Sequence, residues 1–148
     1  MKFRVRTIGI LFALVACSIA FAADESLKPA TQAAESWLAL VDAGQYSQSW
    51  DQASSFFQDK ITKEEWEQTL NSVRTPLGKV ESRQFKAAQY QTNLPGAPDG
   101  KYVIIRYRTK FANAGPMLET VTPTLDKDGT WRVSGYFIKP QDDVTPSR

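Results

Sequence analysis

The stretch that decides the fold runs from residue 101 to residue 111 and reads Lys-Tyr-Val-Ile-Ile-Arg-Tyr-Arg-Thr-Lys-Phe. Its side chains alternate in polarity with a period of two residues. This is the period of a β-strand, because successive residues of a strand point to opposite faces of the sheet. One face takes the more apolar set, Val103, Ile105, Tyr107, Thr109 and Phe111. The other face takes Tyr102, Ile104, Arg106, Arg108 and Lys110. Burial of apolar area contributes about 25 cal/mol per Å², so we expect the first set to face the core.

Turn residues on both sides of this stretch predict further strands. A loop rich in Pro and Gly precedes it at 93–100, and turns with Gly follow at 113–116 and 126–129. The predicted strands are therefore 79–91, 101–111, 117–125 and 130–138, and the short connections imply an antiparallel meander. On the last strand, alternation predicts an apolar side of Trp131, Val133, Gly135 and Phe137. Its other side is predicted to carry Arg132, Ser134, Tyr136 and Ile138.

The residues before the strands predict three helices. Pro29 is placed early in the first, whose apolar residues recur every three or four positions until Gly44 ends it. A second helix is predicted over 46–57. The third begins at Thr62, where Thr62 and Glu65 have the spacing of a capping box. We predict an α+β fold with three N-terminal helices packed on one face of a four-stranded antiparallel meander sheet.

The first 22 residues are typical of a secretion signal peptide. Lys2, Arg4 and Arg6 precede an uncharged apolar run, and Ala20-Phe21-Ala22 offers small residues for cleavage. A polar lead-in is then expected at 23–28, a single domain at 29–140 and a flexible tail at 141–148. We expect a periplasmic or secreted protein with no transmembrane segment after cleavage. The alternative is an outer-membrane lipoprotein anchored through Cys17, because Leu14-Val15-Ala16-Cys17 resembles a lipobox.

Composition excludes several classes of function. The whole chain has 18 basic and 16 acidic residues, but removal of the three leader cations leaves 15 against 16, a net charge of −1. A near-neutral domain is a poor ligand for nucleic acid. The chain has no histidine, and its one cysteine lies in the leader. We therefore expect no cofactor and no metal site, and no histidine-assisted nucleophile.

Several short stretches occur in an order that resembles a known bacterial exported family. They are Trp37-Leu38, Asp42-Ala43-Gly44-Gln45-Tyr46, Ser49-Trp50, Trp66, Arg74 with Pro76-Leu77-Gly78, Arg83, residues 94–100, Tyr102, Thr109-Lys110-Phe111, Glu119 with Val121, and residues 131–136. The family is catalogued as a domain of unknown function (number 4019). This resemblance implies export and the fold but no activity. The order of helices and strands is also similar to cystatin-like and nuclear-transport-factor-2-like α+β rolls.

The polar face of the predicted sheet supplies the main candidate site. Arg106, Arg108 and Arg132, with Lys110, could hold an anion between the rings of Tyr102 and Tyr136. The alternative is a solvated face whose cations pair with carboxylates such as Glu119.

Arg74 could complete a pocket with Glu119, or it could neutralise the last carbonyl groups of its helix. We interpret the tryptophans as core residues, because they fall where the periodicity requires bulk.

Two classes of function remain open. The first is a non-catalytic binding or interaction module whose partner is an unknown protein or a small anionic ligand. The alternative is a small-pocket isomerase or lyase that uses a buried carboxylate, for which Glu119 is the candidate, and a tyrosine. A Glu119 inside a closed apolar cavity without a basic partner would favour the enzyme, whereas pairing with an arginine on an open face would exclude it.

Overall fold

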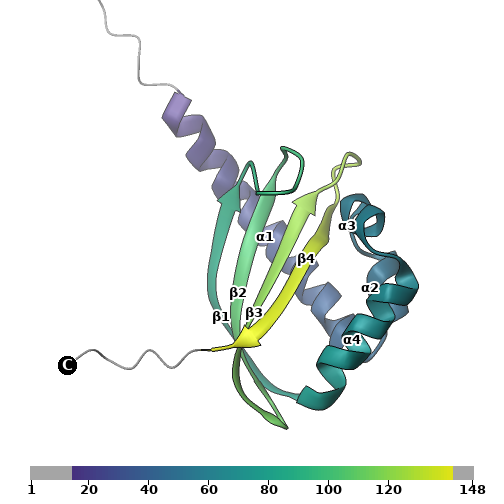
Figure 1. The fold of residues 1–148 in the computed structure, drawn as a ribbon. Coiled ribbons are helices and arrows are strands. Elements are labelled where there is room, and N and C mark those ends of the chain that lie inside the picture. The colour runs from purple at the N-terminus through teal and green to yellow at the C-terminus, as the bar shows by residue number, and fades with distance from the viewer. Residues whose placement is uncertain (1–14, 142–148) are drawn as a thin grey trace, which may run out of the picture.

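The computed structural model describes residues 15–141, with side chains from residue 25 onward. Four helices come first: α1 (Val15–Asp42), α2 (Tyr46–Asp51), α3 (Ser55–Lys60) and α4 (Lys63–Leu77). Four strands follow: β1 (Val80–Gln91), β2 (Tyr102–Phe111), β3 (Ala114–Leu125) and β4 (Trp131–Pro140). The strands form one antiparallel sheet in the order β1-β2-β3-β4. The predicted α+β class and the meander are confirmed (Figure 1).

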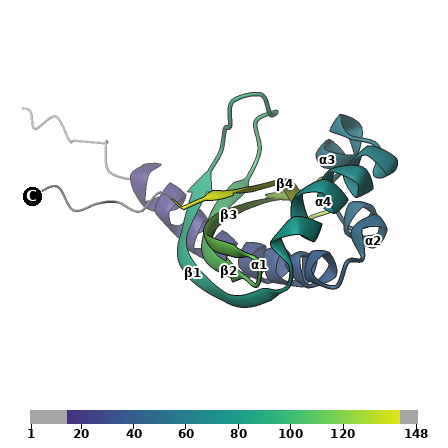
Figure 2. The same ribbon diagram turned by 60° about the horizontal axis from the view of Figure 1, so that its bottom comes forward.

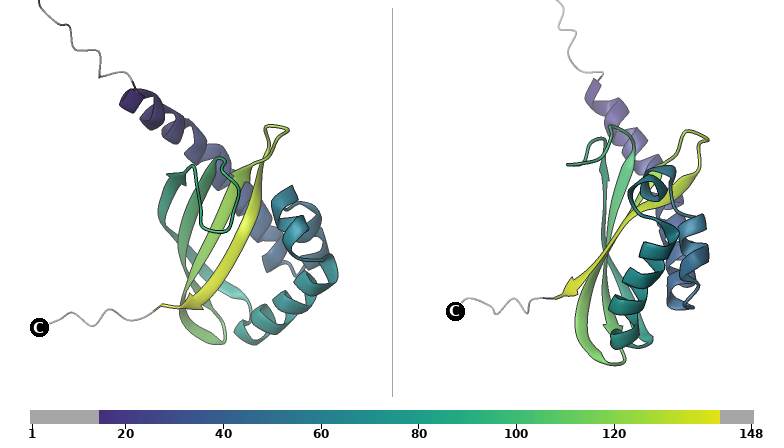
Figure 3. Two further views of the ribbon diagram at one scale, coloured as in Figure 1. Left: turned by 45° about the horizontal axis from the view of Figure 1, so that its top comes forward. Right: turned by 45° about the vertical axis from the view of Figure 1, so that its right-hand side comes forward.

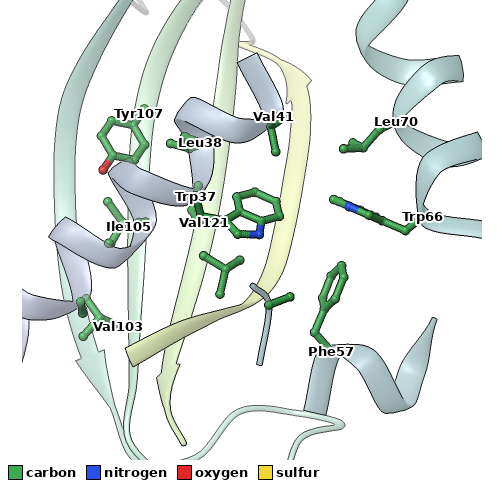
Figure 4. Packing of buried hydrophobic residues seen from close by; sticks show 14 residues of the cluster. Trp37, Leu38, Val41, Phe57, Trp66, Leu70, Val103, Ile105, Tyr107 and Val121 are labelled. Carbon is green, nitrogen blue, oxygen red and sulfur yellow. The ribbon is translucent and has the colours of Figure 1, made fainter. Parts of the chain in front are cut away.

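Helix α1 lies along one face of the curved sheet and contacts all four strands (Figure 2). Its buried residues Trp37, Leu38 and Val41 pack with Val103 and Ile105 of β2, and with other residues of the same cluster (Figure 4). The face against α1 is called the inner face below, and the opposite one the outer face. As the alternation of β2 predicts, Val103, Ile105, Tyr107, Thr109 and Phe111 are all buried, whereas Arg106, Arg108 and Lys110 are exposed.

The helices differ from the prediction in number and in bounds. The segment predicted as one helix over 46–57 is two helices, because Ser54 leaves helical geometry and caps α3 by accepting a hydrogen bond from the Phe57 amide at 3.2 Å. Residues 23–28 were predicted as a lead-in but belong to α1, with Pro29 inside it. Leu27 explains the extension, because it continues the apolar stripe and packs against the core. The predicted leader lies partly outside the described residues.

Helices α2, α3 and α4 gather beside β4 (Figures 1 and 3). The capping box at the start of α4 is confirmed: the Glu65 amide donates to Thr62 Oγ1, and the Thr62 amide donates to Glu65 Oε2. Gly78 ends α4 with φ of +76°, where a Cβ would lie 2.8 Å from Asn113 Nδ2. No helix of the part of the chain that the structure describes is long and apolar enough to cross a membrane.

A bulge in β4 overturns the predicted faces of that strand. Gly135 pairs with Thr122 and Val133 pairs with Pro123, so Ser134 is an extra residue between two consecutive pairs. Because side chains alternate with a period of two, one extra residue reverses every later position. Val133 is buried on the inner face as predicted. Beyond the bulge, Tyr136 points inward and Phe137 is 70% exposed, which is the reverse of the prediction.

Candidate functional site

Six polar side chains meet between the sheet and the helices, and we call them the Glu119 cluster. They come from the end of α1, from α4 and from all four strands: Asp42, Arg74, Arg83, Thr109, Glu119 and Tyr136. Strand pairing places them together, because Arg83 lies opposite Thr109 in the β1–β2 ladder, and Glu119 follows on β3 within the same inner face. The cluster thus ties helix ends to every strand.

Glu119 is completely buried, and both of its carboxylate oxygens are occupied. Oε1 accepts from the Tyr136 hydroxyl at 2.6 Å and from Arg83 Nη2 at 3.2 Å, and it lies 3.5 Å from Arg74 Nη1. Oε2 accepts from Arg83 Nε at 2.7 Å and from the Thr109 hydroxyl. A buried charge is tolerated only when it is paired and hydrogen-bonded in this way.

Asp42 closes the other side of the cluster. Its Oδ1 accepts from Arg74 Nη2 at 2.8 Å and from Arg83 Nη2 at 3.0 Å, and its Oδ2 accepts from Arg83 Nη1 at 2.6 Å. Arg74 Nη1 also donates to the Tyr136 hydroxyl at 2.9 Å, and the guanidinium lies 4.9 Å from the centre of the Phe111 ring. Two arginines therefore face two carboxylates, and the ionised cluster has no net charge.

The electrostatics of the cluster favour the ionised form of Asp42 and the neutral form of Tyr136. Burial alone would raise the pKa of Asp42, but hydrogen bonds from Arg83 and Arg74 outweigh it, and the pKa lies below its ordinary value. Burial and the neighbouring Glu119 carboxylate raise the pKa of Tyr136 far above its ordinary value. The phenol therefore stays protonated and keeps its donated hydrogen bond to Glu119.

This arrangement leaves little room for acid–base chemistry. A general base needs a lone pair directed at a substrate proton, and every oxygen of Glu119 is already directed at an arginine, a tyrosine or a threonine. Within the described residues, no three acidic, cysteine or histidine side chains come together as ligands for a metal ion. The cluster can fix the helices on the sheet, but it offers no free reactive group.

A second inner-face group lies outside the cluster. The Tyr107 hydroxyl is buried and has no hydrogen-bond partner among the residues whose side chains the structure describes. Burial and the nearby Glu35 carboxylate raise the pKa of Tyr107 to about 12. Its ring contacts Phe85 edge-on, with the ring centres 6.1 Å apart.

The outer face carries a different group of residues, which we call the outer patch. It consists of the exposed side chains Arg106, Arg108, Lys110, Phe137 and Lys139. They share one face because the sheet ladders align Arg106 with Thr120 and Phe137, and Arg108 with Leu118 and Lys139. A hollow of about 320 Å³ opens at the edge of the patch beside Arg108 and Lys110, and its other lining residues are Ser82, Arg83, Gln84 and Pro116.

The acidic neighbours of the outer patch are few. Lys110 pairs with Glu81 at 2.8 Å, where both side chains are well exposed. Arg106 and Arg108 form no ion pair or hydrogen bond through their side chains with any residue that the structure describes. Two guanidinium groups are therefore exposed to water, and no carboxylate within residues 25–141 pairs with them.

Tyr102 and Arg132 were predicted to join this face, but neither is open on it. Tyr102 is only 2% exposed, because the 92–101 loop folds over it and the Pro98 carbonyl accepts its hydroxyl hydrogen at 2.6 Å. Arg132, near the start of β4, pairs with two aspartates of the β3–β4 turn, Asp126 at 3.0 Å and Asp128 at 2.9 Å. The predicted site thus divides into the outer patch, these two residues, and the inner group of Arg74, Glu119 and Tyr136.

One known family matches most of the chain. Residues 33–136 match a family described as a protein of unknown function, DUF4019. The chain belongs to the DUF4019 family. The matched range contains the whole Glu119 cluster together with Arg106 and Arg108. No curated protein matches the sequence.

Sequence reasoning missed two charged members of the cluster in this DUF4019 chain. Arg83 was hidden by two irregularities of β1, between Val80 and Ser82 and between Phe85 and Ala87, which break the alternation. The position of Asp42 in the sequence could have indicated its role. A carboxylate in the last turn of a helix is unfavourable next to the helix dipole, and no basic residue of α1 lies in that turn. A compensating cation from elsewhere in the chain was therefore to be expected.

Proposed function

We propose that this chain is an exported, non-catalytic binding module whose outer patch docks an acidic segment of a partner protein. The observation that carries the proposal is the pair Arg106 and Arg108, which is exposed on one strand without an acidic partner among the described residues. The proposal takes the helices to lie on the α1 side of the sheet, so that the outer patch stays open to a partner.

The shape and composition of the patch favour a protein over a small anion. The patch extends across three strands, and the hollow beside Arg108 and Lys110 has room for one carboxylate side chain. Phe137 adds an apolar ring that is 70% exposed. Arginine and aromatic side chains are enriched in protein interfaces, and arginine binds carboxylates through two parallel hydrogen bonds.

The distribution of charge along the chain supports the same partner. Residues 25–78 contain eight acidic and four basic residues, whereas residues 79–141 contain five acidic and ten basic residues. The near-neutral domain therefore has an acidic helical part and a basic sheet. Such a field steers an acidic partner toward the sheet and accelerates association at low salt.

The enzyme alternative loses its main support. It required a buried carboxylate without a basic partner, and Glu119 is paired with Arg83 at 2.7 Å. The phenol of Tyr136 is held between Arg74 and Glu119. Neither group is free to exchange a proton with a substrate.

The docking proposal is tested by affinity capture from periplasmic extract with quantitative mass spectrometry. We expect the wild type to retain a specific acidic protein, and Arg106→Glu/Arg108→Glu to lose it at least tenfold. Lys101→Glu/Lys127→Glu is the matched control, because it makes the same charge change at two exposed lysines elsewhere. A partner that both double variants lose equally, or that neither loses, contradicts the proposal.

Export is proposed separately, with cleavage after Ala22 and a periplasmic or secreted location. The mass of the mature protein tests it. A chain that begins at Ala23 supports cleavage, a diacylated chain that begins at Cys17 identifies the lipoprotein alternative, and an intact residue 1 contradicts export.

A further inference from the structure

A hollow separate from both the Glu119 cluster and the outer patch opens beside the start of β4. It has a volume of about 380 Å³, within the range of small-molecule sites. Its walls come from α1, from the end of α2 and from the start of β4 with Thr130 just before it. The residues that matter for its chemistry are Ser36, Asp51, Gln52, Thr130, Trp131 and Arg132.

Trp131 differs from the other three tryptophans. The indole N–H of Trp37 donates to the Ser49 carbonyl, that of Trp50 to the Ile61 carbonyl, and that of Trp66 to the Ser49 hydroxyl. The indole N–H of Trp131 has no partner within residues 25–141, and its partly buried ring lines the hollow. This donor is not among the buried polar atoms that lack a partner, so it is open to the solvent of the hollow, and a ligand that enters can accept its hydrogen.

The polar groups around Trp131 are of two kinds. The Ser36 hydroxyl, the Gln52 amide and the Thr130 hydroxyl are exposed, and their side chains make no hydrogen bond to any described residue. Together they offer both donors and acceptors.

The charged groups of the hollow are already neutralised. Asp51 pairs with Lys63, and Arg132 pairs with Asp126 and Asp128. Each of the two charged side chains that line the hollow, Asp51 and Arg132, therefore already has an ionic partner. A charged ligand would have to compete with these ion pairs, whereas a neutral polar ligand would not.

We propose that this hollow binds one ring of a neutral carbohydrate, which packs an apolar C–H face against Trp131. The hydroxyl groups of the sugar then meet the indole N–H, the Gln52 amide and the Ser36 hydroxyl, which supply both donors and acceptors. This site is independent of the outer patch, so a glycan and a protein partner would bind at the same time.

Titration of the intact, ¹⁵N-labelled protein with cellotriose, maltotriose and tri-N-acetylchitotriose tests the proposal. The four tryptophans give four indole N–H signals, and Trp131→Phe identifies one of them by its loss. With at least one sugar we expect the Trp131 signal to move and saturate with a Kd in the range of about 0.1–10 mM, while the other three move much less.

Variants locate the binding. Gln52→Ala should weaken the affinity at least threefold, and Trp131→Phe should also weaken it, as followed by the Gln52 side-chain amide signal. Gln48→Ala is the matched control, since it removes the same exposed side chain from α2 outside the hollow. The absence of a saturable Trp131 shift with all three sugars, or an affinity unchanged in both Gln52→Ala and Trp131→Phe, would overturn the proposal.

The outcome is also separable from that of the docking proposal. Arg106→Glu/Arg108→Glu should bind the sugar with the affinity of the wild type. Loss of sugar binding in that variant would show that the outer patch, not the hollow, holds the ligand.

Discussion

Replacement of Glu119 by glutamine tests whether the Glu119 cluster holds the fold together. The side chain keeps its shape, but the cluster loses one of its two negative charges and retains two guanidinium groups, of which that of Arg74 is buried and that of Arg83 partly buried. Arg74 is only 4% exposed in its side chain and Arg83 only 16%, so water compensates little. Removal of one partner from a buried ion pair costs about 3–5 kcal/mol.

That cost is large relative to the stability of a domain. A typical domain is stable by about 5–15 kcal/mol, so Glu119→Gln should remove a large fraction of the free energy of unfolding. At this chain length the loss corresponds to a decrease in Tm of roughly 10–20 °C. Urea unfolding followed by circular dichroism, together with calorimetry, measures both quantities. The control is Glu81→Gln, an exposed carboxylate of the same sheet, for which we expect no measurable change.

A double-mutant cycle separates the effect of the lost charge at Glu119 from the effect of any change in side-chain packing. Arg83→Met in the Glu119→Gln background restores neutrality, because Asp42 and Arg74 remain as a pair. We expect the double variant to lose clearly less stability than the sum of the single variants, with an interaction energy of roughly 1–3 kcal/mol. A loss below about 1 kcal/mol for Glu119→Gln, or strict additivity in the cycle, would refute the reasoning.

Two further predictions concern Tyr107 and Gly78. The pKa of Tyr107 is about 12 in the folded protein, and its ordinary value is 10.0. As pH rises, the phenol therefore ionises first in the unfolded chain. The contribution of the neutral phenol to the free energy of unfolding is complete below pH 10 and is lost as pH rises toward 12. Tyr107→Phe should remove the Tyr107 part of that loss, while the part due to the raised pKa of Tyr136 remains. The variant should lose little stability at pH 7, because the hydroxyl has no partner among the described residues. Urea midpoints of the wild type and the variant at pH 7 and pH 11 check both expectations. Gly78→Ala should lower the free energy of unfolding by about 1–3 kcal/mol, because φ is positive at this position and the new Cβ would contact Asn113 closely. The control is Gly115→Ala, which has open space around it and should leave the urea midpoint nearly unchanged.

Strand β2 was predictable from the sequence because nothing interrupts its alternation. From Val103 to Phe111 each residue lies on the predicted face, so the exposure of Arg106 and Arg108 followed directly. The turns beside it contain residues that favour chain reversal, which defined the meander. The capping box of α4 was equally local, since its two hydrogen bonds join residues three positions apart.

The Glu119 cluster was not predictable in full because it depends on register. The bulge at Ser134 moves Tyr136 to the inner face, and the irregularities of β1 conceal Arg83. A bulge changes the pairing between strands, which a pattern read along one strand does not contain. The sequence indicated Arg74 and Glu119 as one possible pair, but the convergence of Asp42, Arg83 and Tyr136 on them is a property of the assembled sheet.

The cluster and the outer patch are linked by the strand that lies between them. Arg106 and Arg108 belong to β2, which pairs along its length with β1 on one side and β3 on the other. On the inner face, the ion pair of Arg83 and Glu119 connects β1 with β3. The two exposed guanidinium groups are therefore held on a fixed backbone, and a partner that binds them does not have to order the strand first. It follows that Glu119→Gln should weaken docking only to the extent that it unfolds the domain. Under conditions where that variant is fully folded, its affinity for the partner should equal that of the wild type, whereas Arg106→Glu/Arg108→Glu should lose affinity without losing stability.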